Sequence, residues 1–101
     1  MGRIFPCSYL NGNVELTEER EQHIIQNHPR TLPDYLSQLA ETLNHPDQIK
    51  HSKFDSSALL FSKWFDNIRS GRYFVVVVVN DLPNQRYWII TAYTARKLAG
   101  G

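Results

Sequence analysis

The chain has 101 residues, of which 42% are hydrophobic and 21% charged, and its formal net charge is +1. This length fits one domain with a single core, and the composition favours neither intrinsic disorder nor a membrane-protein class. The near-zero charge neither requires nor excludes nucleic acid, because an RNA site needs only a local cluster of cations.

Cellular location and cysteine chemistry follow from what the sequence lacks. No run approaches the roughly 18 apolar residues that span a bilayer, and the start lacks the apolar core of a secretory signal, so we expect a cytoplasmic protein. Cys7 is the single cysteine, so an internal disulfide and a cysteine-rich zinc site are excluded. A free cysteine of this kind is typically a small buried hydrophobe.

The N-terminal part is expected to be an arm followed by a helix. Residues 1–15 contain the turn-forming pair Asn11-Gly12 and are expected to form a loosely attached arm, whereas residues 16–45 form the helical part. Thr17 is a good N-cap, and the glutamates after it suit the positive end of the helix dipole. This first helix is predicted to end near Asn27 or His28, before Pro29.

A second helix is predicted from Pro33 to Leu43. Proline is favoured at the first helical position, and leucines recur at helical spacing to give one apolar stripe that faces a core. The residues after Asn44 then break the helical pattern.

Residues 48–96 are expected to form an antiparallel sheet. Four segments have the composition of strands: Gln48 to Ser52, Ala58 to Phe65, Tyr73 to Val79 and Arg86 to Tyr93. The unbroken valine run at 75–79 predicts a strand that is buried on both faces or has a central place in the sheet. Short polar connections favour hairpins, so the expected fold is a single α+β domain, residues 1–101, with two N-terminal helices packed on a four-stranded antiparallel β-meander.

The last predicted strand has one chemically interesting face. Trp88, Ile90 and Ala92 share one parity and resemble core residues, whereas Thr91 and Tyr93 lie on the opposite face. The two hydroxyls and the aromatic ring of that face suit a phosphate oxygen or a stacked base, although cross-strand pairing alone also explains such residues.

Two histidines lie on or at the end of the first predicted helix. His23 and His28 are five residues apart, about 140° around the helix, so they do not share a narrow face and a helical metal pair is not expected. One of them should face inward and the other should face solvent or a cleft, and the sequence leaves open which. Histidine is the side chain best suited to move protons near neutral pH.

Four cations are candidates for binding phosphate: Arg30, Lys53, Lys63 and Arg72. Arginine is the better match to a bidentate phosphate contact, although most charges of this kind are simply solvated.

Several short motifs together resemble a nuclease superfamily. They are the Leu16-Thr17-Glu18-Glu19-Arg20 helix start, His23-Ile24, Asn27-His28-Pro29, the valine strand and the terminal Ile89-Ile90-Thr91-Ala92-Tyr93. They resemble phage and polymorphic-toxin members of the barnase, EndoU, colicin and RelE-like (BECR) superfamily over roughly residues 14 to 96.

The resemblance implies a RelE/barnase-like fold and metal-independent cleavage of RNA, through attack of the 2′-hydroxyl to leave a cyclic phosphate. It implies His23 and His28 as acid and base, and Thr91 with Tyr93 as groups that face the substrate. Arg30, Lys53 and Arg72 are the substrate-binding candidates, no metal or other cofactor is involved, and an antitoxin or immunity protein is a candidate partner.

Three hypotheses therefore remain. The first is a toxin-type endoribonuclease with histidine acid-base catalysis, acting on RNA and with homodimer formation left open. The second is a non-catalytic protein-binding or RNA-binding module with a degenerate nuclease fold. The third is a small hydrolase that uses Cys7 with a histidine.

Overall fold

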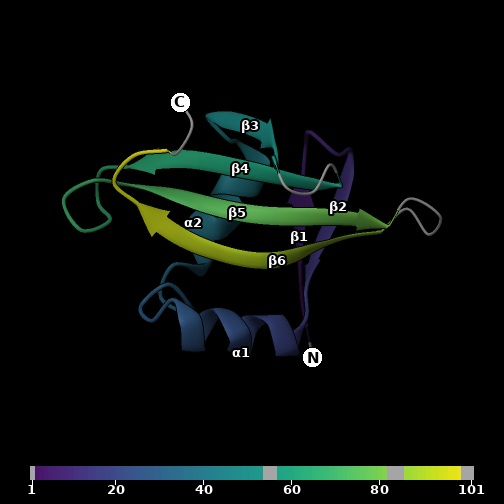
Figure 1. Ribbon diagram of the computed structural model, residues 1–101, viewed down its shortest axis with the longest axis horizontal. Coiled ribbons are helices and arrows are strands. Elements are labelled where there is room, and N and C mark those ends of the chain that lie inside the picture. The colour runs from purple at the N-terminus through teal and green to yellow at the C-terminus, as the bar shows by residue number, and fades with distance from the viewer. Residues whose placement is uncertain (1, 54–56, 82–85, 99–101) are drawn as a thin grey trace.

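A computed structural model describes residues 2–53, 57–81 and 86–98. These residues form one mixed sheet and two helices (Figure 1). The elements in chain order are β1 (Arg3–Cys7), β2 (Gly12–Leu16), α1 (Glu18–Asn27), α2 (Leu36–Asn44), β3 (Gln48–His51), β4 (Ala58–Phe65), β5 (Arg72–Asp81) and β6 (Arg86–Ala95).

The expected sequence signals set both ends of α1. The hydroxyl of Thr17 accepts a hydrogen bond from the Arg20 backbone N–H at 3.2 Å, and three glutamates occupy the first turn. At the other end, His28 is the C-cap and its backbone N–H donates to the Ile24 carbonyl. The predicted helix from Thr17 to Asn27 or His28 is confirmed.

The second helix is shorter than predicted. It begins at Leu36 rather than Pro33, because residues 31–35 form turns in which the Tyr35 N–H donates to the Thr31 carbonyl. Thr31 and Leu32 are buried in this turn, at 4% and 3% exposed, so packing holds the segment out of the helix.

The sheet differs from the expected one, and the predicted fold of two helices on a four-stranded meander is wrong. Six strands lie in the order β1-β2-β6-β5-β4-β3, and β2 pairs with β6 in parallel while the other pairs are antiparallel. The predicted strands at 48–52, 58–65, 73–79 and 86–93 are all present, as β3 to β6. The error lies in the two strands that precede the helices.

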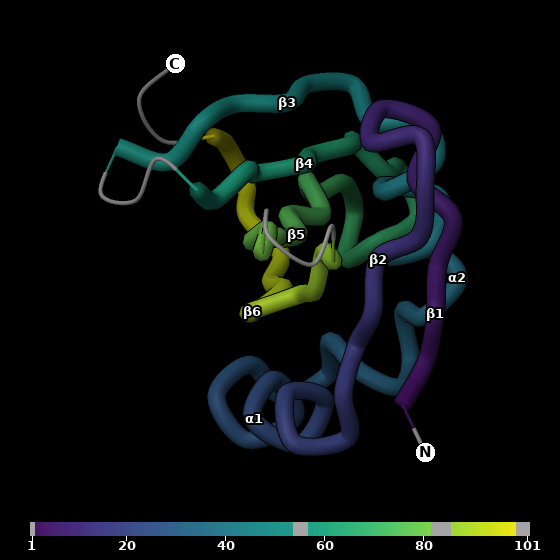
Figure 2. The backbone as a smooth tube through the Cα atoms, turned by 90° about the vertical axis from the view of Figure 1, so that its right-hand side faces the viewer, coloured from purple at the N-terminus to yellow at the C-terminus, as the bar shows by residue number. Residues whose placement is uncertain are grey.

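These two strands come from the segment that was expected to be an arm. Residues 3–16 form a hairpin around the Asn11-Gly12 turn, with Arg3 opposite Leu16 and Cys7 opposite Gly12. The side chains of Val14 and Leu16 are fully buried in the core. The hairpin therefore contributes to the core, and Figure 2 shows it running beside α2 on one side of the long strands.

The three long strands have one face against the core and one facing away from it. Phe61 of β4 and Phe74, Val76 and Val78 of β5 belong to the core cluster beneath α2 and the hairpin. We call the opposite face the outer face. It carries Val75 and Val79 of β5, which are buried at 2% and 9% exposed, and the half-buried Val77. β5 lies between β6 and β4, so the predicted central place of the valine strand is confirmed.

A register shift in β6 changes which of its residues face the core. Val78 pairs with Ile89 but Val77 pairs with Thr91, which leaves Ile90 as an extra residue in a bulge. Ile89 and Ala92 are consequently both fully buried. The prediction that residues of one parity form the core along the whole strand is wrong, because the bulge reverses the parity at its midpoint.

Within the described ranges, no helix has the length and hydropathy needed to cross a membrane.

Candidate functional site

The structure brings one predicted histidine and one predicted tyrosine together. His28, at the end of α1, lies against Tyr93 of β6, with 5.7 Å between the ring centroids and 35° between the ring planes. Both residues are partly exposed. Ile24, buried in the core, fixes α1 alongside β6, and this packing sets the position of His28 (Figure 2).

Tyr93 also lines a small pocket on the outer face. The described residues around this pocket come from four strands and the segment after β6: Gln48, Lys50, Leu60, Ser62, Val75, Tyr93 and Leu98. Its volume of about 60 Å³ is far below the roughly 300–1,000 Å³ of a pocket that encloses a whole small molecule. A pocket of this size has room for one small chemical group and not for a whole ligand.

Strand pairing places Thr91 on the same outer face. Thr91 pairs with Val77 and Tyr93 pairs with Val75, so both side chains lie on the side that carries the pocket. Both residues are partly exposed. The prediction that Thr91 and Tyr93 share a face away from the core agrees with this register.

His23 is not part of this group. It is exposed on α1, its carbonyl accepts a hydrogen bond from the Asn27 amide at 2.9 Å, and that amide lies 3.4 Å from its ring Nδ1. Among the described ring contacts, His28 and not His23 is the histidine that meets β6.

The three predicted substrate-binding cations are dispersed. Arg72 uses its Nη1 to donate to the carbonyls of Arg69 and Gly71, at 2.9 and 2.7 Å, so it holds the turn before β5. Arg30 is exposed two residues after His28 and has a left-handed backbone with φ of 71°. Lys53 is exposed in the segment after β3.

Lys63, the other candidate cation, takes part in a surface ion-pair cluster. Its Nζ lies 3.8 Å from a Glu41 carboxylate oxygen and 3.6 Å from one of Asp47. Its neighbours Phe61 and Phe65 in β4 place it on the core side of the sheet, away from Tyr93.

Lys50 is the cation that lines the pocket, and the sequence reasoning missed it. It is partly buried in β3 and pairs with Leu60 of β4, which also lines the pocket. Alternation along β3 was the available signal, because Gln48 and Lys50 share one face while Ile49 packs on the core. Lys50 therefore brings an amino group to the lining of the pocket.

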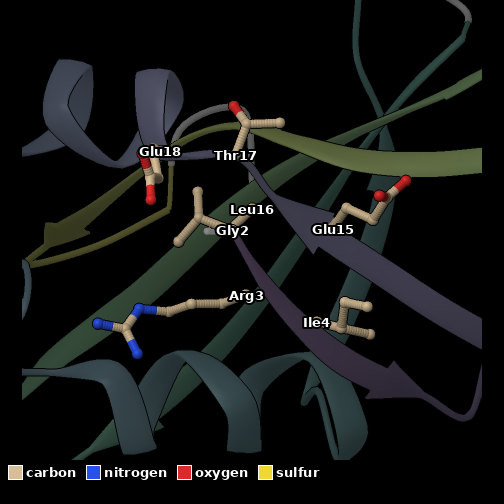
Figure 3. A pocket seen from close by; sticks show the side chains of 7 residues that line it. All are labelled: Gly2, Arg3, Ile4, Glu15, Leu16, Thr17 and Glu18. Atoms are coloured by element: carbon tan, nitrogen blue, oxygen red, sulfur yellow. The ribbon is translucent and has the colours of Figure 1, made fainter.

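A larger cleft lies elsewhere. It has a volume of about 560 Å³ and is formed by β1, the end of β2 and the start of α1, as Figure 3 shows. Its one described cation, Arg3, donates to Glu21 at 3.0 Å, and Glu15 and Glu18 are its carboxylates. No histidine is among its described lining residues, so the larger cleft lacks the group that the predicted chemistry needs.

Metal and thiol chemistry gain no support. Within residues 2–53, 57–81 and 86–98, no group of three or more His, Cys, Asp or Glu side chains is placed to hold a metal ion. Cys7 is 2% exposed, and burial raises the pKa of its thiol despite lowering contributions from the backbone of Leu10 and Tyr9. A buried, protonated thiol is a poor nucleophile.

Comparison of the chain with protein-family models, with curated proteins and with solved structures gave no match. The functional interpretation therefore depends on the geometry of the outer face.

Proposed function

We propose that this chain is a metal-independent endoribonuclease whose site is centred on His28 and Tyr93. The observation that carries the proposal is the contact of the His28 and Tyr93 rings, 5.7 Å between centroids, beside the pocket that contains Lys50. A proton-transfer group thus meets an aromatic residue that lines the same pocket as a cation.

The reaction that these groups suit is internal transesterification of RNA. The 2′-oxygen forms a bond to phosphorus while the bond from phosphorus to the 5′-oxygen breaks, leaving a 2′,3′-cyclic phosphate. In this proposal His28 takes the 2′-hydroxyl proton, and the Tyr93 phenol gives a proton to the departing 5′-oxygen. Lys50 offsets the negative charge that builds up on the phosphorane, and the Thr91 hydroxyl donates to a phosphate oxygen.

The size of the pocket agrees with this assignment. At about 60 Å³ it is too small for a nucleotide, so in this proposal it takes the phosphate while the flanking sugars and bases lie outside it. The cytoplasm is the proposed location because RNA is the proposed substrate. An antitoxin or immunity protein and a second copy of this chain are the proposed protein partners.

The decisive experiment compares two histidines on one helix. Purified protein is incubated with a mixed-sequence RNA in EDTA, and products are separated on a gel and checked for a cyclic phosphate end. We expect cleavage by wild type, a loss of about 100-fold or more in His28→Gln, and little change in His23→Gln, because general acid-base groups contribute about 10²–10⁴ in rate.

The control for folding is thermal melting of both variants. Loss of cleavage on adding EDTA would contradict a metal-independent reaction. Equal cleavage by wild type and His28→Gln would refute the assignment of the site, because His23 shares the helix and the chemistry but lacks the contact with β6.

A non-catalytic RNA-binding module is the second candidate. The observation that favours it is that the predicted groups make different contacts: His23 bonds with Asn27, Arg72 holds the β4–β5 turn, and His28 is the one imidazole in the described ring pair. This candidate predicts retention of labelled RNA by the wild-type protein with no shortening of the RNA on prolonged incubation.

A further inference from the structure

One large aromatic side chain on the outer face stays exposed although it is firmly held. Trp64 of β4 is 40% exposed, whereas most large apolar side chains of the described chain are buried. Its indole Nε1 donates to Asp66 Oδ1 at 2.6 Å, and Tyr73 meets it edge-on at 5.0 Å between centroids. Its backbone N–H donates to Asp47 Oδ2 at 2.8 Å.

The turn between β4 and β5 forms a close surface against this indole. A Cβ at Gly71 would lie 2.6 Å from Trp64 Cζ2, so only glycine fits there, and the Gly71 φ of +111° also favours glycine. The Arg72 guanidinium holds the turn by donating to the carbonyls of Arg69 and Gly71. The ring is therefore positioned before any ligand arrives, which reduces the entropy cost of binding.

The register connects Trp64 with the proposed site. Trp64 pairs with Tyr73, and the next row on the same face is Ser62, Val75 and Tyr93. The positions of Trp64 and Tyr93 are two residues apart along the strands and two strands apart across the sheet. In a regular sheet this is a distance of about 12 Å. Ser62 and Val75, which lie between them, line the pocket that contains Lys50.

We propose that Trp64 is a stacking platform for an unpaired base of RNA, next to the nucleotides that flank the cleaved phosphate. The proposal rests on the function proposed above. It identifies a residue that contributes to the affinity for single-stranded RNA beyond the cleaved phosphate. Base stacking on an aromatic side chain requires a single-stranded ligand and tolerates any base, because every base has a π-face.

The surroundings of Trp64 favour a stacked nucleobase over a protein as the group that covers it. One charged side chain bonds the indole itself: the exposed Asp66 carboxylate accepts from its Nε1–H, while Asp47 accepts from the Trp64 backbone N–H. The centres of protein interfaces are depleted in such charges. A rigid, exposed aromatic ring with a carboxylate bonded at its edge suits one stacked base, which needs little apolar area.

The test measures binding without cleavage. A fluorescently labelled single-stranded 2′-deoxy oligonucleotide lacks the attacking hydroxyl, so its Kd is measured by anisotropy even if the enzyme is active. We expect Trp64→Ala to raise Kd about 10-fold, within the roughly 5- to 150-fold that base stacking supports. Trp64→Phe, which keeps a ring, should rescue much of this loss.

The matched control is another exposed aromatic residue. Tyr9 is 58% exposed and packs edge-on against Phe61, which belongs to the core cluster, so it lies on the other side of the sheet. Tyr9→Ala should bind the oligonucleotide as wild type does. In Trp88→Phe, Trp64 is the sole remaining tryptophan, and its fluorescence should change when the oligonucleotide binds.

The outcomes separate this inference from the proposed function. Equal oligonucleotide affinities of wild type and Trp64→Ala would overturn the platform, even if RNA is cleaved through His28. Trp64-dependent binding with no cleavage of RNA would support the platform and refute the nuclease. If oligonucleotides leave Trp64 fluorescence unchanged and Trp64→Ala instead disrupts self-association, the residue is a protein contact and the inference is wrong.

Discussion

Replacing Gly71 by alanine should destabilise the fold and displace Trp64. Gly71 is buried in the β4–β5 turn with φ of +111°, a backbone conformation that L side chains rarely adopt. The added methyl group would also lie 2.6 Å from Trp64 Cζ2 and 3.0 Å from Cη2. Two separate penalties therefore arise from one methyl group.

The backbone penalty is about 1–3 kcal/mol, the usual cost of holding a non-glycine residue in a sparsely populated region. The indole is bonded to Asp66 and packed on Tyr73, so moving it adds about 1 kcal/mol for the hydrogen bond alone. A loss of about 2 kcal/mol lowers Tm by about 8–16 °C in a domain of this size.

The assay is urea unfolding of wild type, Gly71→Ala and a control, Gly12→Ala. A Cβ at Gly12 would lie 3.8 Å from its nearest neighbour, the Leu10 carbonyl oxygen, so this control should change the free energy of unfolding by less than about 0.5 kcal/mol. In a Trp64→Ala background the clash disappears, so Gly71→Ala should cost about 1 kcal/mol less there. Equal stability of the two glycine variants would refute this account.

Two further predictions concern the core. Ile24→Ala, at the fully buried residue of α1, should lower the free energy of unfolding by about 2–5 kcal/mol in urea titrations, and a loss below 1 kcal/mol would show that α1 is not anchored there. Cys7 should react with iodoacetamide at pH 8 about 10-fold or more slowly than free cysteine, because burial raises its pKa and keeps it protonated. Since burial raises the pKa of the folded thiol, its contribution to stability is present below the unfolded pKa and is lost as the pH rises through the raised folded pKa. Rapid labelling of the folded protein would contradict the expectation that Cys7 is buried and protonated.

Local signals in the sequence were sufficient for the elements that depend on neighbouring residues. The cap at Thr17, the stop before Pro29 and the valine run predicted α1 and β5 correctly, since capping, proline sterics and β-propensity act within a few residues. The same alternation places Thr91 and Tyr93 on one face. Their functional roles stay predictions.

The tertiary structure decided the features that depend on distant partners. Residues 3–16 have no strong strand signal of their own and become strands because β2 lies beside β6, where Glu15 is opposite Trp88. The bulge at Ile90 reverses the pattern that alternation predicts, and it exists because β5 and β6 must match across the sheet. The choice of His28 over His23 and the recruitment of Lys50 likewise follow from packing, since Ile24 orients α1 and the β3–β4 pairing turns Lys50 toward the pocket. Local signals predicted α1 and β3 to β6, but contacts between residues far apart in the chain decide where α2 begins and which side chains meet.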